Sequence, residues 1–211
     1  MNPIWFFVPN LIGYARIATA AWAYVVARDQ PIVFLVMYTI SFVLDAADGM
    51  AARALDQCSR FGAILDMVTD RAATAGFLCI LSSLMGPHTA LPAAGLIALD
   101  IMSHMVRIYS SAALNEASHK DMKSPFPFLN LYYGNRQVMG ALCVGQEFCY
   151  LVLYAMHFWP AATYLEHSLY VLVPLCALKQ YANVEQLIDG FRRIANADHE
   201  EREQRKRSIR K

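Results

Sequence analysis

The sequence predicts an all-α, polytopic membrane protein with six transmembrane helices. Of its 211 residues, 57% are hydrophobic and only 17% are charged, whereas soluble domains carry about 25% charged residues. Apolar runs that approach the ~20 residues of a bilayer-spanning helix also recur along most of the chain. A soluble helical bundle of this composition would have to bury too many helices that are apolar on every side.

Six apolar segments account for the predicted helices, and turn-forming residues separate them. Pro31, Pro87 and Pro160 lie near segment ends, where proline favours a helix boundary. The segments cover about residues 11–27, 32–55, 62–85, 90–113, 138–159 and 168–188. Because neither an internal repeat nor a second domain is visible, we expect residues 1–211 to form a single membrane domain that ends in a basic tail from about residue 192.

Lysine and arginine are distributed unevenly between the two predicted sides of the membrane. The three short loops on one side contain only Arg28. The other side carries the basic tail and Arg53, Arg60, Lys120, Lys123 and Arg136. Since basic loops stay in the cytosol, both termini are predicted to be cytosolic. The net charge of +1 gives no general case for nucleic-acid binding, and the tail is expected to be solvated, with membrane lipids as compatible partners.

Four aspartates indicate where chemistry takes place. Asp45 and Asp48 are three residues apart, late in the second segment. Asp66 and Asp70 are four residues apart, early in the third. On helices each pair projects from one face, and an antiparallel hairpin of the two segments brings all four side chains to the same depth.

Four carboxylates at one depth in a membrane require cations. One ionised aspartate at the centre of a membrane helix costs about 2.5–3.5 kcal/mol, and only Arg53 and Arg71 lie close enough in sequence to offset the charge. Carboxylate oxygens suit Mg²⁺ or Mn²⁺, and this number of ligands indicates two ions bridged by shared oxygens, as at phosphoryl-transfer sites. The alternative is that the acids pair with the two arginines or face water.

The residues around the aspartates fit a site for a phosphate-bearing substrate. Gly49 leaves the backbone bare beside Asp48, so that a bulky group can approach closely. Arg53 lies one helical turn beyond Gly49, where its planar guanidinium can bind a phosphate.

Together these residues form a motif with fixed spacing. It reads Asp45-x-x-Asp48-Gly49-x-x-Ala52-Arg53, eight residues, Gly62-x-x-x-Asp66-x-x-x-Asp70. This motif resembles the complete signature of the CDP-alcohol phosphatidyltransferases. Within that family, the chain is similar to the eukaryotic phosphatidylinositol synthases over most of its length. The wider similarity rests on residues 8–17, AARAL and RFGAILDMVTDR beside the motif, Ser103-His104 and Ser118-His119-Lys120.

The resemblance implies a substrate pair, a location and residue roles. It implies CDP-diacylglycerol as donor, myo-inositol as acceptor, a polar cavity facing the cytosol, and a homodimer in the endoplasmic reticulum membrane. The implied metal ligands are Asp45, Asp48, Asp66 and Asp70, with Asp70 also the catalytic base. The implied contacts to CDP-diacylglycerol are Gly49, Arg53 and Ser59.

A second polar stripe lies on one face of the fourth segment. Asp100, His104, Arg107 and Ser111 follow helical spacing, which fits either a cavity wall that binds a polyol or an internal hydrogen-bond network. His104, Arg107 and Arg136 are the candidate acceptor-pocket residues.

Two other functions stay open at this stage. The motif does not specify the acceptor, so glycerol phosphate, serine, choline or an inositol phosphate are alternatives, although a phosphorylated acceptor would require a further basic cluster. A cation transporter could also use carboxylates inside the membrane. Against that class, the acids gather near one membrane face and the chain lacks the repeats common in carriers.

Overall fold

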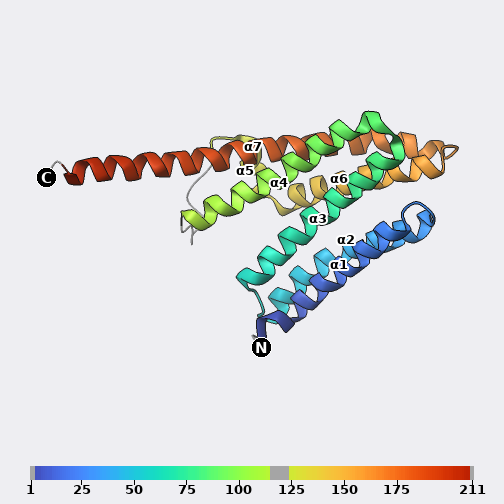
Figure 1. The fold of residues 1–211 in the computed structure, drawn as a ribbon, viewed down its shortest axis with the longest axis horizontal. Helices are drawn as coiled ribbons and strands as arrows, with labels where there is room; N and C mark the ends of the chain where they lie inside the picture. Colours follow the sequence, from blue (N-terminus) through green and yellow to red (C-terminus); the bar gives the residue numbers. More distant parts are fainter. Residues whose placement is uncertain (1–2, 115–123, 210–211) are drawn as a thin grey trace. The chain divides into compact units, whose positions relative to one another are not determined.

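The computed structural model describes residues 3–114 and 124–209, and within these ranges the fold is all-α (Figure 1). The elements are η1 (Pro3–Phe6), α1 (Val8–Val26), α2 (Pro31–Ala54), α3 (Arg60–Met85), η2 (Pro87–Thr89), α4 (Ala90–Ala113), α5 (Pro127–Gly134), α6 (Arg136–Phe158) and α7 (Thr163–Ile209). The predicted fold class is therefore confirmed at the level of helices. Ser118, His119, Lys120 and Lys123, on which part of the sequence interpretation depended, lie outside the described residues.

The helix ends follow from local sequence. Pro31 and Pro127 occupy the start of α2 and α5, where the missing N–H of proline costs nothing. Ser59 caps α3, because its Oγ accepts a hydrogen bond from the backbone N–H of Gly62 at 3.0 Å. At the other end of α3, Gly86 adopts a φ of 105°, which a side chain would disfavour.

Three stretches of helix in the described part of the chain are long and apolar enough to cross a membrane: Pro31–Ala54, Pro87–Ala113 and Arg136–Phe158. These match the second, fourth and fifth predicted segments. The first, third and sixth segments are also helical, as α1, α3 and part of α7. In α3 the apolar character is interrupted by Asp66, Asp70 and Arg71. A count of six spans stays a prediction.

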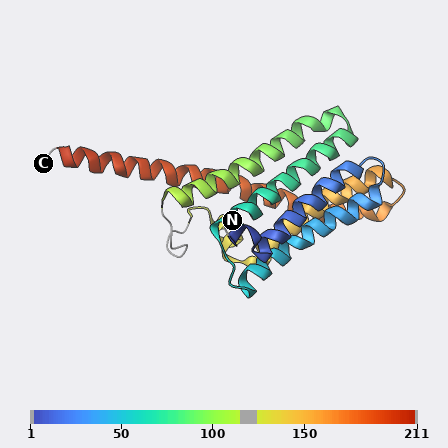
Figure 2. The same cartoon turned by 60° about the horizontal axis from the view of Figure 1, so that its bottom comes forward.

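The chain divides into two compact units. Unit 1 comprises Met1–Ile97 and Tyr150–Ser168, and unit 2 comprises Ala98–Cys149 and Leu169–Lys211. Unit 1 contains α1, α2 and α3, and in both ribbon views α1 and α2 run side by side in opposite directions (Figures 1 and 2).

Small residues allow the helices of unit 1 to approach closely. A Cβ on Gly13 of α1 would lie 3.1 Å from Cδ2 of Leu65 in α3, and a Cβ on Gly76 of α3 would lie 2.7 Å from the ring of Tyr24 in α1. The Tyr24 hydroxyl donates a hydrogen bond to the carbonyl of Ala73 at 2.6 Å. Such small-residue contacts are typical of helices that pack within membranes.

Aromatic side chains fill the interior of unit 1. Phe34, Phe77 and Tyr154 are fully buried, with ring centroids 4.2 Å apart for Phe34 and Tyr154 and 5.0 Å apart for Phe34 and Phe77. The Tyr154 hydroxyl donates to the carbonyl of Ala27 at 2.5 Å, so its polar atom is satisfied.

Unit 2 has its own small apolar core, formed by Leu129, Tyr132, Leu142 and Ala182. The helix α7 contributes Ala182 and then continues to Ile209, giving 47 residues in one helix. The basic tail from about residue 192 is therefore helical and largely exposed. Glu, Arg, Lys and Gln favour helix, and pairs such as Lys206 with Glu203, at 2.8 Å, support it.

Candidate active site

Four aspartates from α2 and α3 surround the guanidinium group of Arg16 from α1. Nη2 of Arg16 lies 2.6 Å from Asp45 and Nη1 lies 2.8 Å from both Asp48 and Asp66. Asp70 also forms an ion pair with Nη2. The structure thus brings together the four acids that the spacing predicted to converge.

Arg16 is the residue that sequence reasoning missed. Proximity in sequence points to Arg53 and Arg71 as the cations that offset the acids, but Arg16, 32 residues before Asp48, contacts all four of them. Nη2 of Arg71 lies 3.5 Å from Oδ2 of Asp70. The available signal was a lone arginine in an apolar helix, because such a charge needs partners at the same depth.

Contacts between α1 and α2 hold Arg16 in place. Its backbone carbonyl accepts a hydrogen bond from Ser41 of α2 at 3.0 Å and another from Thr19 of its own helix at 3.0 Å. Ser41 and Arg16 are both buried. The hydrogen bond from Ser41 ties the backbone of α1 at Arg16 to α2, and the ion pairs with the four acids position the guanidinium.

The acids form a set of ligands that fits a divalent metal ion. Oxygens of Asp45, Asp48 and Asp66 all lie within 4.8 Å of one another. Two guanidinium groups, those of Arg16 and Arg71, face four carboxylates, so the cluster has an excess of two negative charges. Hard oxygen ligands with excess negative charge favour a cation such as Mg²⁺ or Mn²⁺. Asp70 stands outside the three-acid group and is held by Arg16 and Arg71.

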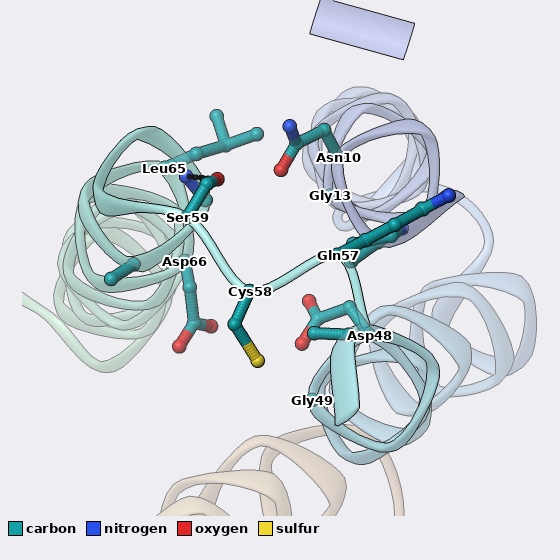
Figure 3. Close-up of a pocket in the computed structure, with 13 residues that line it drawn as sticks. Asn10, Gly13, Asp48, Gly49, Gln57, Cys58, Ser59, Leu65 and Asp66 are labelled. Carbon is teal, nitrogen blue, oxygen red and sulfur yellow. Dashed lines mark hydrogen bonds between the residues drawn. The ribbon is translucent and has the colours of Figure 1, made fainter. Parts of the chain in front are cut away.

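A cavity of about 160 Å³ in unit 1 adjoins two of these acids (Figure 3). Its lining includes Asp48, Asp66, Gly49 and Ser59. Gly49 and Ser59, which the family resemblance assigned to CDP-diacylglycerol, are therefore both placed at this cavity. Ser59 also has a structural task there, since its Oγ caps α3.

Arg53 folds back along α2 over Gly49. A Cβ on Gly49 would lie 3.4 Å from Nη1 of Arg53. The Arg53 side chain is exposed, and no acid in the described part of the chain pairs with it. Its guanidinium therefore lies beside the cavity with its donors available to an anionic ligand.

The three candidate acceptor-pocket residues lie in unit 2. His104 Nδ1 lies 2.8 Å from the carbonyl oxygen of Asp100. Arg107 is 3.6 Å from Asp189 and stacks over the ring of Tyr133, 4.9 Å from its centroid. Arg136 is exposed at the first position of α6. Their role toward an acceptor stays a prediction.

Comparison with known sequences identifies the class of protein. A sequence model of the CDP-alcohol phosphatidyltransferase family matches residues 6–164, which is more than half of the chain. The chain belongs to this family.

The similar proteins of known function share one activity. The CDP-diacylglycerol–inositol 3-phosphatidyltransferase of Saccharomyces cerevisiae is 38% identical over 185 residues, which cover 87% of this chain and 83% of the relative. The human protein of the same name is 38% identical over 211 residues, covering 96% of this chain and 98% of the relative. A probable enzyme of this kind from Arabidopsis thaliana is 43% identical over 151 residues, or 71% and 66% of the two chains. No solved structure matches the chain significantly.

Proposed function

We propose that this protein transfers the phosphatidyl group of CDP-diacylglycerol to myo-inositol, giving phosphatidylinositol and CMP. The observation that carries the proposal is the convergence of four motif aspartates beside a cavity in a member of the CDP-alcohol phosphatidyltransferase family. The choice of inositol is supported by relatives from yeast, human and plant, all of which are named as inositol enzymes.

Asp45, Asp48, Asp66 and Asp70 would hold Mg²⁺ or Mn²⁺, and the number of acids favours two ions. The separation of Asp70 from the three-acid group supports a distinct role for it. Bound ions would neutralise the negative charge that develops on the two phosphates of CDP-diacylglycerol as the P–O bond between them breaks. The remaining steps depend on the side chains of this protein.

Arg53 is placed to hold the pyrophosphate of the donor, since its guanidinium is exposed and lies over Gly49 at the edge of the cavity. Asp70 would take the proton from an inositol hydroxyl, and that oxygen would attack the phosphorus on the lipid side. The bond from this phosphorus to the oxygen of the CMP phosphate breaks, and CMP leaves with the bonding electron pair. The protein contributes mainly positioning and electrostatics.

We further propose how the protein is arranged in its membrane. Residues 1–211 would form one membrane domain with six spans, its cavity and both termini facing the cytosol. The distribution of lysine and arginine in the loops supports this orientation. The endoplasmic reticulum location, the homodimer and the acceptor contacts of His104, Arg107 and Arg136 follow from the family resemblance and the polar stripe alone.

The test is CMP release by the purified protein. The protein is supplied with CDP-diacylglycerol, Mn²⁺ or Mg²⁺, and in turn myo-inositol, serine, glycerol phosphate, choline and an inositol phosphate. We expect CMP release with myo-inositol and phosphatidylinositol as the lipid product. Asp66→Asn should abolish it, whereas Asp29→Asn, an exposed acid in the turn after α1, should not. Release with another alcohol in preference to inositol would refute the assigned acceptor.

A further inference from the structure

The guanidinium of Arg16 fills the space between the acids of α2 and those of α3. Its Nη1 lies 2.8 Å from Asp48 of α2 and 2.8 Å from Asp66 of α3. Its Nη2 lies 2.6 Å from Asp45 of α2 and also pairs with Asp70 of α3. Mg²⁺ binds carboxylate oxygens at about 2.0–2.1 Å. An ion that joins an acid of α2 to an acid of α3 therefore needs the space that these nitrogens fill.

The charge of Arg16 opposes metal binding as well. Its side chain is 3% exposed, so little water separates it from the aspartates. Like charges a few ångströms apart repel strongly where water is excluded. The guanidinium and a divalent ion are therefore competitors for the same carboxylates, both in space and in charge.

The guanidinium is not fully satisfied among the aspartates. Nε of Arg16 is buried and has no hydrogen-bond partner in residues 3–114 or 124–209. Oγ1 of Thr69, a residue of α3 that is 4% exposed, also lacks a partner within these ranges. Thr69 directly precedes Asp70. A buried polar atom without a partner is costly, so one unused donor and one unused hydroxyl lie in this part of unit 1.

Thr69 faces α1 at about the level of Arg16. Two contacts between α1 and α3 fix the register: Leu65 lies against Gly13, and the carbonyl of Ala73 accepts a hydrogen bond from α1 further along. Thr69 is four residues from both Leu65 and Ala73, so the three share one face of α3. Counted from the first contact, Arg16 is three residues along α1 and Thr69 four residues along α3. The two differ by about one residue's rise, ~1.5 Å.

We propose that Arg16 is a displaceable counter-ion of the metal site, and that the Thr69 hydroxyl receives its guanidinium when a divalent ion takes the aspartates. The inference rests on the proposed function, in that it assumes a divalent ion bound by these acids. In the metal-free protein Arg16 offsets the repulsion between the carboxylates. In the metal-bound protein it has turned away from them and donates a hydrogen bond to Oγ1 of Thr69. Arg16 therefore lowers the affinity of the site for metal, and Thr69 raises it.

The test is the dissociation constant of Mn²⁺, measured by calorimetry on the metal-stripped, full-length protein in detergent. Arg16→Gln should bind Mn²⁺ at least 10-fold more tightly than the wild type, because the competing cation is gone. Thr69→Val replaces the hydroxyl by a methyl group of similar size. It should bind Mn²⁺ about 3- to 10-fold more weakly, because one hydrogen bond is lost in the metal-bound form alone. In the Arg16→Gln background, Thr69→Val should have no further effect.

Thr74→Val is the matched control. Thr74 is also a residue of α3 and is also 4% exposed, but it lies beyond the four acids in the chain. This variant should leave the dissociation constant of Mn²⁺ unchanged. Thr69→Ser keeps a hydroxyl at the proposed position and should retain the affinity of the wild type.

Two results would overturn the proposal. Equal or weaker binding of Mn²⁺ by Arg16→Gln would show that Arg16 does not compete with metal. An unchanged dissociation constant in Thr69→Val would show that the hydroxyl does not receive the guanidinium. Because Thr69→Val removes no ion pair, it decides the question even where Arg16→Gln fails to fold. CMP release with inositol, measured on the same wild-type preparation in saturating Mn²⁺, separates this failure from failure of the proposed function.

Discussion

Replacement of Arg16 by glutamine removes a cation that contacts all four aspartates. The Arg16 side chain is 3% exposed and the Asp48 side chain 10%, so this part of the cluster lies largely out of water. Breaking a buried ion pair by removing one partner costs about 3–5 kcal/mol. Since the Asp66 side chain is 47% exposed and keeps some hydration, we expect the lower end, about 3 kcal/mol.

The loss should be visible as a lower unfolding temperature in the absence of divalent metal. For a chain of 150–250 residues, 1 kcal/mol shifts the midpoint by about 2–4 °C, so Arg16→Gln should unfold about 6–12 °C below the wild type in EDTA. Metal at about 100 times its dissociation constant contributes about 2.7 kcal/mol. It should therefore recover most of the loss, and the rise on adding Mn²⁺ should be larger in the variant than in the wild type.

The assay is thermal unfolding of the detergent-solubilised protein in EDTA and in Mn²⁺. Arg28→Gln is the control, because Arg28 is exposed and lies away from the aspartates, donating a hydrogen bond to the hydroxyl of Ser83 at 3.1 Å. Arg28→Gln should unfold at the same temperature as the wild type, both in EDTA and in Mn²⁺. Equal unfolding temperatures for Arg16→Gln and wild type in EDTA would refute the idea that Arg16 balances the aspartates in the metal-free protein.

Three further predictions concern turnover. A chelator should abolish CMP release and Mg²⁺ or Mn²⁺ should restore it, because excess negative charge stays on the aspartates; full turnover in excess EDTA would contradict the metal site. Arg53→Ala should remain folded but use CDP-diacylglycerol at least 10-fold less efficiently, because the exposed guanidinium binds the substrate and forms no ion pair with an acid in the described part of the chain. A variant that is unfolded in detergent but has normal kinetics in membranes would show that Arg53 has a structural role. Asp70→Asn should still bind CDP-diacylglycerol with metal yet lose nearly all transfer, whereas Asp48→Asn should lose binding as well; substantial turnover in Asp70→Asn would exclude it as the base.

The convergence of the aspartates could be predicted from sequence because it depends on local geometry. Spacings of three and four place Asp45 with Asp48, and Asp66 with Asp70, on single helix faces. A short connection then makes the two helices neighbours. Both steps use only residues close in the chain, and the structure agrees with both.

The contributions of α1 could not be predicted in the same way. Arg16 reaches the acids only because α1 packs beside α2 and α3, and no local pattern specifies that register. Such side-chain positions follow from tertiary contacts, which a spacing rule does not contain.

The tail illustrates the opposite case. Its charged composition suggests a solvated segment, and it is solvated, but it is also a helix up to Ile209. The segment has no apolar face to bury, so hydrophobic periodicity gives no signal. Its order comes from the propensity of its residues and from continuation of α7, whose earlier turns are already fixed by packing around Ala182.

The length of α7 offers a practical opportunity for imaging. At 1.5 Å per residue its 47 residues extend about 70 Å, more than twice the ~30 Å hydrocarbon thickness of a bilayer. A protein of 23.7 kDa is a small target for the alignment of single particles in electron micrographs. A marker protein fused at Ile209 through a helix in register with α7 would add mass at the end of a continuous helix. Because α7 is already ordered there, the attached marker would report the orientation of the helix from which it projects.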